Sequence, residues 1–250
     1  MAKGDVVLVL DREGLALEAA RRFALACAEA VRRAGRFSVA LSGGSSPVSL
    51  YTTLASGAYR SKINWDSVHV FWGDERCVPP DHVESNYKTA SDTLLKHVPI
   101  PLDQIHRMRG EDPNPETAAI EYAEVLRATF QLKPDEWPRF DLVLLGVGAD
   151  GHTASLFPGS PTLREAKRLV AVCDAPSRQR RLTLTLPVIN NARTVIVLVA
   201  GTGKEAALRR VLQEKNPTDP LPAQLIKPKG RLIWLIDEES AQHSAIRRQP

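Results

Sequence analysis

The stretch FDLVLLGVGADGHTASLFPGS, residues 140–160, decides the fold because an apolar run ends in a turn rich in glycine. Continuous rather than alternating apolar character indicates a strand that is buried on both faces, as in parallel sheets covered by helices. The turn Gly146-Val-Gly148-Ala-Asp-Gly151 satisfies the Gly-x-Gly-x-x-Gly pattern of dinucleotide-binding proteins, but His152 follows it directly. The stretch therefore predicts either a cofactor loop or a hydrolytic site.

Runs of the same kind recur along the chain and alternate with helical patterns. The predicted strands are Val6–Leu10, Phe37–Leu41, Val68–Trp72, Asp141–Leu145, Leu169–Val172, Thr194–Val199 and Leu232–Ile236. The predicted helices are Leu15–Arg33, Pro47–Leu54, Ser85–His97, Pro115–Phe130 and Lys204–Gln213. Helical crossovers between buried strands predict an α/β fold with a mainly parallel sheet and helices on both faces, a Rossmann-like three-layer sandwich. Because the proline-rich joints are short, we expect residues 1–250 to form a single domain.

Composition narrows the class of protein. The chain has 250 residues, of which 43% are hydrophobic, enough to bury a substantial core. Three widely spaced cysteines suggest neither a disulfide framework nor a zinc site, which favours the cytoplasm. No signal peptide or membrane span is expected. The net charge of +4 suits an anionic small substrate or a nucleic acid, although most of these charges are expected on a solvated surface.

Ligands of open α/β sheets bind at the carboxyl ends of the strands, so residues that follow strands are the first candidates. The segment Ser42-Gly43-Gly44-Ser45-Ser46-Pro47 follows a strand and opens a helix. Small residues allow close approach of a ligand, and free N–H groups at a helix start favour an anion, so a phosphate site is predicted. The alternative is an ordinary turn with Ser46 as the helix cap.

Two further strands end in charged residues. Gly73-Asp74-Glu75-Arg76 supplies a guanidinium suited to a phosphate or an oxyanion, or else forms a self-neutralised surface cluster. Gly201-Thr-Gly203-Lys204 places a lysine at a helix start. It is not a Walker A loop, because Leu198 and Glu205 stand where glycine and serine or threonine are required. Lys204 is either a phosphate ligand or an exposed surface lysine.

The dinucleotide interpretation of the opening stretch has one point in favour and one against. Asp174 follows a later strand near the usual separation of a ribose-binding acid. However, Pro158, Gly159 and Pro161 shorten any helix after the glycines to about one turn. His152 at the end of a buried strand is instead suited to general acid–base catalysis.

Four segments together resemble the 6-phosphogluconolactonase family, the second enzyme of the oxidative pentose phosphate pathway. They are LSGGSSP (41–47), GDERCVPPDHVESNY (73–87), GVGADGHTASLFPGS (146–160) and RLTLTLPVIN (181–190), and they occur in family order within a similarity that spans Val6 to Asp237. The resemblance implies hydrolysis of 6-phospho-D-glucono-1,5-lactone without a metal or organic cofactor. It also implies the fold of sugar-phosphate isomerases and deaminases.

By this resemblance His152 is the general base that activates water and then the acid that protonates the leaving oxygen. Backbone N–H groups or Arg76 stabilise the oxyanion. Asp150 either orients His152 or shapes the turn, and Asn86 either starts a helix or contacts substrate. The implied phosphate and substrate ligands are Ser42, Gly43, Gly44, Ser45, Asp74, Arg76, Lys204 and, as a weaker candidate, Arg181.

Three other functions stay open at this point. Glucosamine-6-phosphate deaminase has a similar sheet, but its Gly-His-Ile-Ala-Phe-Asn-Glu-Pro segment is replaced here by GHTASLFP (151–158), which lacks the glutamate. A dinucleotide-dependent oxidoreductase and a non-catalytic sugar-phosphate-binding protein are the others. In each case we expect a small-molecule partner and neither a nucleic acid nor a membrane; the sequence indicates no protein partner.

Overall fold

The fold is described by a computed structural model that covers residues 4–214 and 217–242. Within these ranges, six strands form one sheet in which every neighbouring pair is parallel. Their order is β1 (Asp5–Val9), β9 (Arg231–Asp237), β8 (Thr194–Val199), β5 (Leu142–Gly146), β2 (Phe37–Leu41) and β3 (Val68–Trp72). All carboxyl ends of these strands therefore lie along one edge of the sheet.

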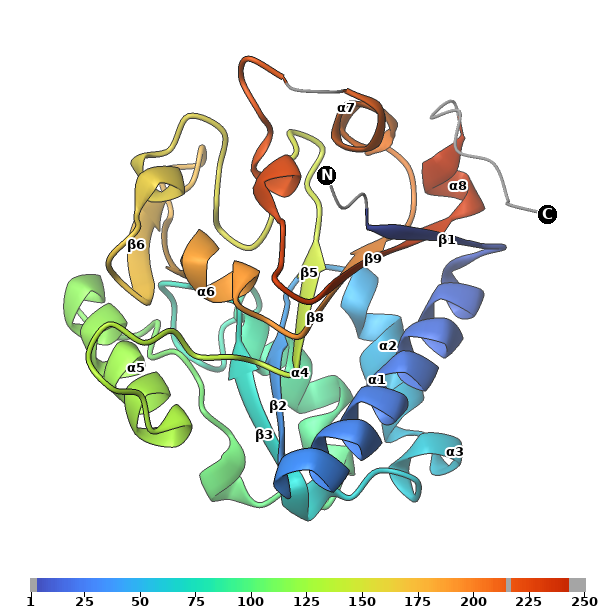
Figure 1. The fold of residues 1–250 in the computed structure, drawn as a ribbon, viewed down its shortest axis with the longest axis vertical. Coiled ribbons are helices and arrows are strands. Elements are labelled where there is room, and N and C mark those ends of the chain that lie inside the picture. Colours follow the sequence, from blue (N-terminus) through green and yellow to red (C-terminus); the bar gives the residue numbers. More distant parts are fainter. Residues whose placement is uncertain (1–3, 215–216, 243–250) are drawn as a thin grey trace.

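Helices cover both faces of this sheet and complete the three layers (Figure 1). Helices α1 (Arg12–Ala34) and α2 (Ser46–Ala55) lie on one side, and α5 (Pro115–Phe130) and α6 (Leu186–Asn190) lie on the other. The remaining helices are α3 (Gly57–Arg60), α4 (Asn86–Thr93), α7 (Glu205–Gln213) and α8 (Glu238–Ala241), with 3-10 helices at Trp65–Ser67, Leu95–His97, Leu102–Gln104, Pro161–Arg164 and Pro222–Leu225. The predicted α/β fold is confirmed.

A second, antiparallel sheet stands at the carboxyl edge of the first. It contains β4 (Asp74–Arg76), β7 (Arg180–Leu184) and β6 (Val170–Asp174) in that order. Gly73 is the only residue between β3 and β4, and its carbonyl accepts a hydrogen bond of 2.8 Å from the N–H of Leu184. The small sheet is thus joined directly to the end of β3, where a ligand of the large sheet would bind.

Local signals in the sequence fix several of these elements. Asp11 caps α1 by accepting the N–H of Gly14 at 2.8 Å, and Gly35 ends the helix in the left-handed conformation with φ of 69°. Strands β2 and β5 are apolar at nearly every position, and both Val39 and Leu144 are completely buried. One hydrophobic core contains residues of both sheets, including Leu182 and Leu184 of β7. The hydrophobic core thus extends across both sheets, and the single domain stays a prediction.

The sequence prediction differs from the structure in several places, and the short helices α3, α6 and α8 are among the elements that it missed. The strand predicted at Leu169–Val172 is β6, which lies in the antiparallel sheet and not among the parallel strands. The helix predicted at Ser85–His97 is divided, because α4 ends at Thr93 and a 3-10 helix follows it. Strands β4 and β7 were not predicted, because both are short and contain charged residues, as the sequences DER and RRLTL show.

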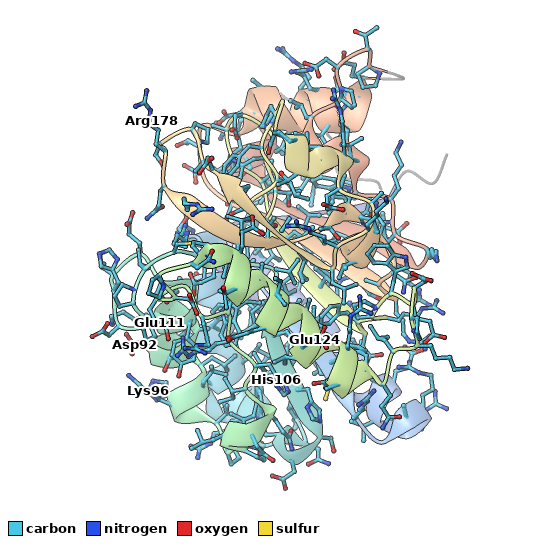
Figure 2. The ribbon with its side chains drawn as sticks, turned by 90° about the vertical axis from the view of Figure 1, so that its left-hand side faces the viewer. Asp92, Lys96, His106, Glu111, Glu124 and Arg178 are labelled. Atoms are coloured by element: carbon cyan, nitrogen blue, oxygen red, sulfur yellow. The ribbon has the colours of Figure 1, made fainter. Side chains whose placement is uncertain are left out.

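His69 of strand β3 and the neighbouring His106 are packed as neutral rings. His69 Nδ1 and His106 Nε2 lie 3.3 Å apart, and the His106 ring stacks on Phe71 with centroids 4.5 Å apart. The backbone carbonyl of His106 accepts the hydroxyl of Tyr122 on α5, and Figure 2 labels His106 in this region. Burial lowers the pKa of His106 to about 4, with His69 contributing, and burial also lowers the pKa of His69.

We expect this pair to make folding stability depend on pH. Both folded-state pKa values lie below the ordinary value of ~6.5, so the unfolded chain binds more protons in acid. The contribution is full above pH ~6.5 and is lost as the pH falls toward about 4. Urea unfolding at pH 7.5, 6 and 4.5 should show a smaller acid loss for His106→Gln than for the parent or for His97→Gln, an exposed control. An equal acid loss in all three would contradict neutral packing of the pair.

Candidate active site

A pocket of about 190 Å³ lies at the carboxyl edge of the parallel sheet, between the two sheets. Most of the residues singled out from the sequence line it. They are Ser42, Gly43, Gly44, Ser45, Asp74, Arg76, His152, Arg181 and Lys204; Ser46, Gly146, Val147, Gly148 and Ala154 complete the wall. Asp150 and Asn86 do not line the pocket but touch residues that do.

A larger hollow of about 380 Å³ is formed by residues 157–162 and 172–176. It contains one charged side chain, Asp174, so the charged candidate residues are concentrated in the smaller pocket.

His152 is held by Asp150 through one ring nitrogen. The Nδ1 atom lies 2.5 Å from Asp150 Oδ1, and the same oxygen accepts the backbone N–H of His152 at 3.1 Å. In this arrangement Nδ1–H donates to the carboxylate, so Nε2 carries the lone pair. The ring packs on Phe157 with centroids 4.8 Å apart. The geometry gives a fixed imidazole with one basic nitrogen at the pocket wall.

The glycine turn is shaped around this ring. A Cβ on Gly148 would lie 2.2 Å from His152 Cε1 and Nδ1, so the imidazole occupies the space that a side chain would fill. Gly151 has φ of +81°, and its N–H donates to the carbonyl of Gly148 at 3.0 Å. No α-helix follows in residues 152–160. In a dinucleotide-binding site the second glycine of the pattern lets the pyrophosphate approach the backbone. Here the equivalent glycine, Gly148, leaves room for the His152 ring. Asp174 ends β6 in the other sheet, away from the place of a ribose-binding acid.

Arg76 and Arg181 face each other across the antiparallel pair of β4 and β7. The Nε atoms of both side chains are buried and have no hydrogen-bond partner among the described residues. Burial lowers the pKa of Arg181, and the charge of Arg76 lowers it further. The Arg181 guanidinium lies over the ring of Phe157, 5.7 Å from its centroid. Two half-buried cations side by side are suited to an anion, which would offset both desolvation and repulsion.

The opposite part of the pocket combines a helix start with a lysine. Lys204 Nζ donates to Ser46 Oγ at 3.3 Å and to the carbonyl of Ala200 at 3.1 Å. Burial lowers its pKa, while Asp237 acts in the other direction. Ser42 Oγ is buried without a partner among the described residues, and Gly44 has φ of +88°. The loop supplies a hydroxyl and a helix N-terminus to the pocket, and Lys204 supplies an ammonium group. These are groups that bind a phosphate.

Behind the pocket, two acidic residues and an amide form a buried network. Asp74 Oδ2 accepts the hydroxyl of Ser155 at 2.6 Å, and Asn86 Nδ2 donates to the Asp74 carbonyl at 2.8 Å. Glu75 is 2% exposed and accepts four donors, three of them around the start of α4 and the fourth the backbone N–H of Arg76. The acidic residues are therefore not a surface cluster that neutralises Arg76. Asn86 packs so close to Gly43 that a Cβ there would meet its Oδ1 at 1.7 Å.

Sequence reasoning missed Ser155, and it mentioned Gly148 only as part of a cofactor pattern. The serine has no signal of its own, because its role depends on Asp74, which is 81 residues away. In the part of the chain that the structure describes, no three His, Cys, Asp or Glu side chains are grouped so that they could hold a metal ion. Within the same residues, no helix is long and apolar enough to cross a membrane.

Comparison with known proteins gives consistent similarities. Residues 10–234 match the family model described as glucosamine-6-phosphate isomerases/6-phosphogluconolactonase. The chain is 43% identical over 215 residues to 6-phosphogluconolactonase of a Synechocystis strain, covering 86% of this chain and 88% of that one. It is 45% identical to the human protein of the same name, covering 87% and 84%. The structure of 6-phosphogluconolactonase from Trypanosoma cruzi superposes with a TM-score of 0.84 at 29% identity, covering 98% of both chains.

The contact between Gly148 and the imidazole predicts that Gly148→Ala displaces His152. The added methyl group cannot share the ring's position, so the bond from Nδ1 to Asp150 should break, and overpacking should cost roughly 1–3 kcal/mol of unfolding free energy. Nitrogen-15 NMR of the histidine rings should show loss of the Nδ1-protonated form of His152. Gly57→Ala is the control, since a Cβ there meets nothing within 4 Å. An unchanged His152 signal in folded Gly148→Ala protein would show that the ring does not depend on this glycine.

Proposed function

This chain belongs to the glucosamine-6-phosphate isomerase/6-phosphogluconolactonase family, and we propose that it hydrolyses 6-phospho-D-glucono-1,5-lactone to 6-phospho-D-gluconate in the oxidative pentose phosphate pathway. The observation that carries the proposal is the pair of Asp150 and His152 at the wall of a cationic pocket. A lactone is an activated cyclic ester, so a base that deprotonates water is sufficient and no covalent nucleophile is needed.

The proposed reaction has two steps. His152 Nε2 takes a proton from water, and the hydroxyl oxygen bonds to C1 of the lactone while the carbonyl oxygen becomes an oxyanion. The tetrahedral intermediate then breaks the bond between C1 and the ring oxygen, which receives the proton from the imidazolium. Asp150 holds the ring and stabilises its charge in between. Arg76 and Arg181 supply positive charge on one side of the pocket, where an oxyanion or a substrate anion is stabilised.

We place the substrate phosphate at the loop from Ser42 to Ser46 together with Lys204. Among the described residues, the Lys204 ammonium group donates only to a hydroxyl and a carbonyl, so its positive charge is available to a phosphate. The buried hydroxyl of Ser42 supplies a further donor. This position puts the phosphate on different elements from the arginine pair, so the pocket addresses two ends of one substrate. Arg181, which the sequence suggested as a weak phosphate ligand, is assigned to the other end.

We also propose that the reaction takes place in the cytoplasm. All three cysteines are free, and Cys27 and Cys173 are buried. Burial raises the pKa of Cys27 to about 11, so its thiol is protected from ionisation. Buried free thiols fit a reducing compartment, where sugar-phosphate metabolism supplies the substrate.

Replacement of the base tests the mechanism. His152→Gln keeps a hydrogen-bonding side chain but removes the base, so kcat/KM should fall by ~10²–10⁴-fold. Lactone hydrolysis is followed after subtraction of the spontaneous rate, with His97→Gln as an exposed control that should match the parent. Activity near that of the parent in folded His152→Gln protein would exclude the base role and direct attention to Asp74, Glu75 and Asp150.

Replacement of the lysine tests the phosphate position. Lys204→Met should weaken binding of the phosphorylated lactone by roughly 1.5–3 kcal/mol, the contribution of a charge-assisted hydrogen bond. The effect should appear in KM and should be absent for unphosphorylated gluconolactone. Lys229→Met is an exposed control. Equal losses for both lactones would mean that Lys204 does not contact the phosphate.

A further inference from the structure

The two arginines of the pocket are held from their outer side by residues that do not line it. Arg76 Nη1 donates to the backbone carbonyl of Glu84, and Arg181 Nη2 donates to Gln179 Oε1 at 3.3 Å. Both acceptors are uncharged. The buried Nε atoms have no such partner among the described residues. The outer hydrogen bonds thus engage one terminal nitrogen of each guanidinium, while both arginines also line the pocket.

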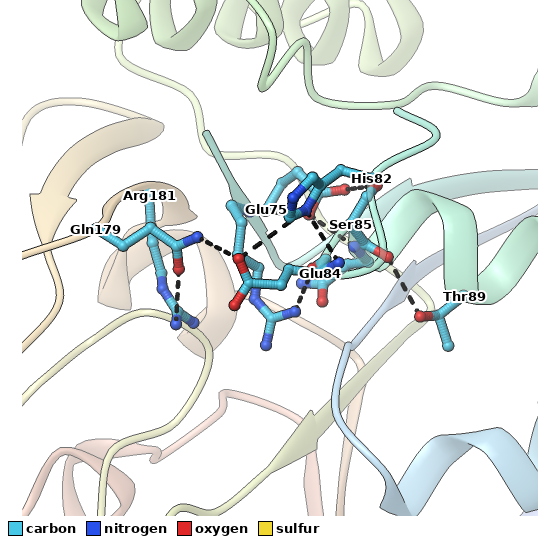
Figure 3. Close-up of polar contacts among 9 residues, drawn as sticks. Glu75, His82, Glu84, Ser85, Thr89, Gln179 and Arg181 are labelled. Atoms are coloured by element: carbon cyan, nitrogen blue, oxygen red, sulfur yellow. Dashed lines mark hydrogen bonds and ion pairs between the residues drawn. The ribbon is translucent and has the colours of Figure 1, made fainter. Parts of the chain in front are cut away.

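Gln179 joins the two outer attachments through its amide. Its Nε2 donates to Glu84 Oε2 at 3.0 Å, while its Oε1 accepts from Arg181, as Figure 3 shows. Glu84 belongs to the loop after β4, and Gln179 belongs to the turn between β6 and β7. His82 Nδ1 accepts the backbone N–H of Glu84 at 3.2 Å. One amide thus connects two loops that are 95 residues apart.

The turn that carries Gln179 is itself fixed. Arg178 has φ of 62°, and its N–H donates to the carbonyl of Ala175 at 2.7 Å. The N–H of Ala175 donates to the carbonyl of Gln179 at 3.0 Å. The side chain of Arg178 projects from the tip of this turn into solvent (Figure 2). Arg178, in the left-handed conformation, thus directs its own side chain outward, while the side chain of the following residue, Gln179, lies beside Arg181.

An amide at position 179 is better suited to this place than a carboxylate. Two adjacent cations repel each other, and Arg76 already disfavours the charged form of Arg181. A carboxylate in contact with Arg181 would relieve that repulsion but would also compete with the substrate for the guanidinium. The amide supplies the directional hydrogen bond without neutralising the charge. The Glu84 carboxylate bonds to the Gln179 amide and not to Arg181 itself.

We propose that Gln179 and Glu84 are positioning residues that hold Arg181 and Arg76 side by side, with their free N–H groups directed at an anionic group of the ligand. This inference rests on the proposed function for the identity of that ligand. It concerns the end of the pocket opposite Lys204, which receives the lactone carbonyl before reaction and the carboxylate of the product after it. Gln179 and Glu84 contact neither the substrate nor the product.

The test uses the full-length protein, lactone turnover and calorimetric binding of 6-phosphogluconate. Gln179→Leu removes both amide bonds and should lower kcat/KM and weaken product binding by roughly tenfold each. Gln179→Glu should be worse than Gln179→Leu in both measurements, because its carboxylate neutralises Arg181. Glu84→Leu removes the acceptor of the Gln179 amide and should lower both quantities, but by less than Gln179→Leu, because the bond from Arg181 to Gln179 remains. Without ligand, all midpoints of thermal unfolding should lie within about 2 °C of each other.

A double-mutant cycle with Arg181→Ala separates positioning from a general structural effect. If Gln179 acts through Arg181, Gln179→Leu should cause no further loss in the Arg181→Ala background. Independent, additive losses in that background would overturn the inference, as would unchanged product binding by Gln179→Glu. Gln104→Leu is the control, since it removes a distant glutamine that bonds to the carbonyl of Asp66.

Failure of the proposed function would look different. A parent protein that binds 6-phosphogluconate but does not hydrolyse the lactone would refute the lactonase activity, and the binding cycle would still decide the role of Gln179. A parent that hydrolyses the lactone, with Gln179→Leu equal to it in turnover and in product binding, would refute the positioning role alone.

Discussion

The buried carboxylates of Asp74 and Glu75 hold the site together, because each connects parts of the chain that are distant in sequence. Glu75 accepts the N–H groups of Asn86 and Tyr87 and the hydroxyl of Ser85, and so fixes the start of α4. Asp74 receives Ser155 from the loop that carries the histidine. Burial raises the pKa of Glu75, while the donors act in the opposite direction. N–H and O–H groups engage both acids, and the guanidinium of neither Arg76 nor Arg181 has a hydrogen bond to them among the described residues, although the charge of Asp74 raises the pKa of Arg181.

The parallel sheet could be predicted because its signal is local, whereas the small sheet depends on distant pairing. Strands such as Phe37–Leu41 are apolar throughout, which only a doubly covered sheet explains. Strand β4 has three residues, all charged, and is a strand only because Asp74 pairs with Thr183 more than one hundred positions later. The propensity of a strand depends on the partner that it meets. For the same reason β6 was predicted as a strand but not assigned to its sheet.

The site was predictable to the extent that its residues follow strands. His152 and Lys204 each lie in the loop that follows the carboxyl end of a buried strand, so position alone made them candidates. Arg181 came only from family resemblance, since it lies on the unpredicted β7. Gly148 shows the limit of a motif: the same glycine spacing admits a pyrophosphate or an imidazole. The two kinds of site differ in the group that packs against the α-carbon of this glycine. In this protein that group is the ring of His152, a tertiary contact that the motif does not specify.

The electrostatics of the pocket favour an anionic ligand over a neutral one. Burial lowers the pKa of both Arg181 and Lys204, because a cation that loses water is less stable in its charged form. Their protein partners are amide, carbonyl and hydroxyl oxygens, which replace the lost water only in part. A phosphate or a carboxylate restores the missing interaction, whereas a neutral sugar cannot. The unfavourable partial burial of cations on separate elements therefore gives a physical reason to expect selectivity for a ligand that carries negative charge.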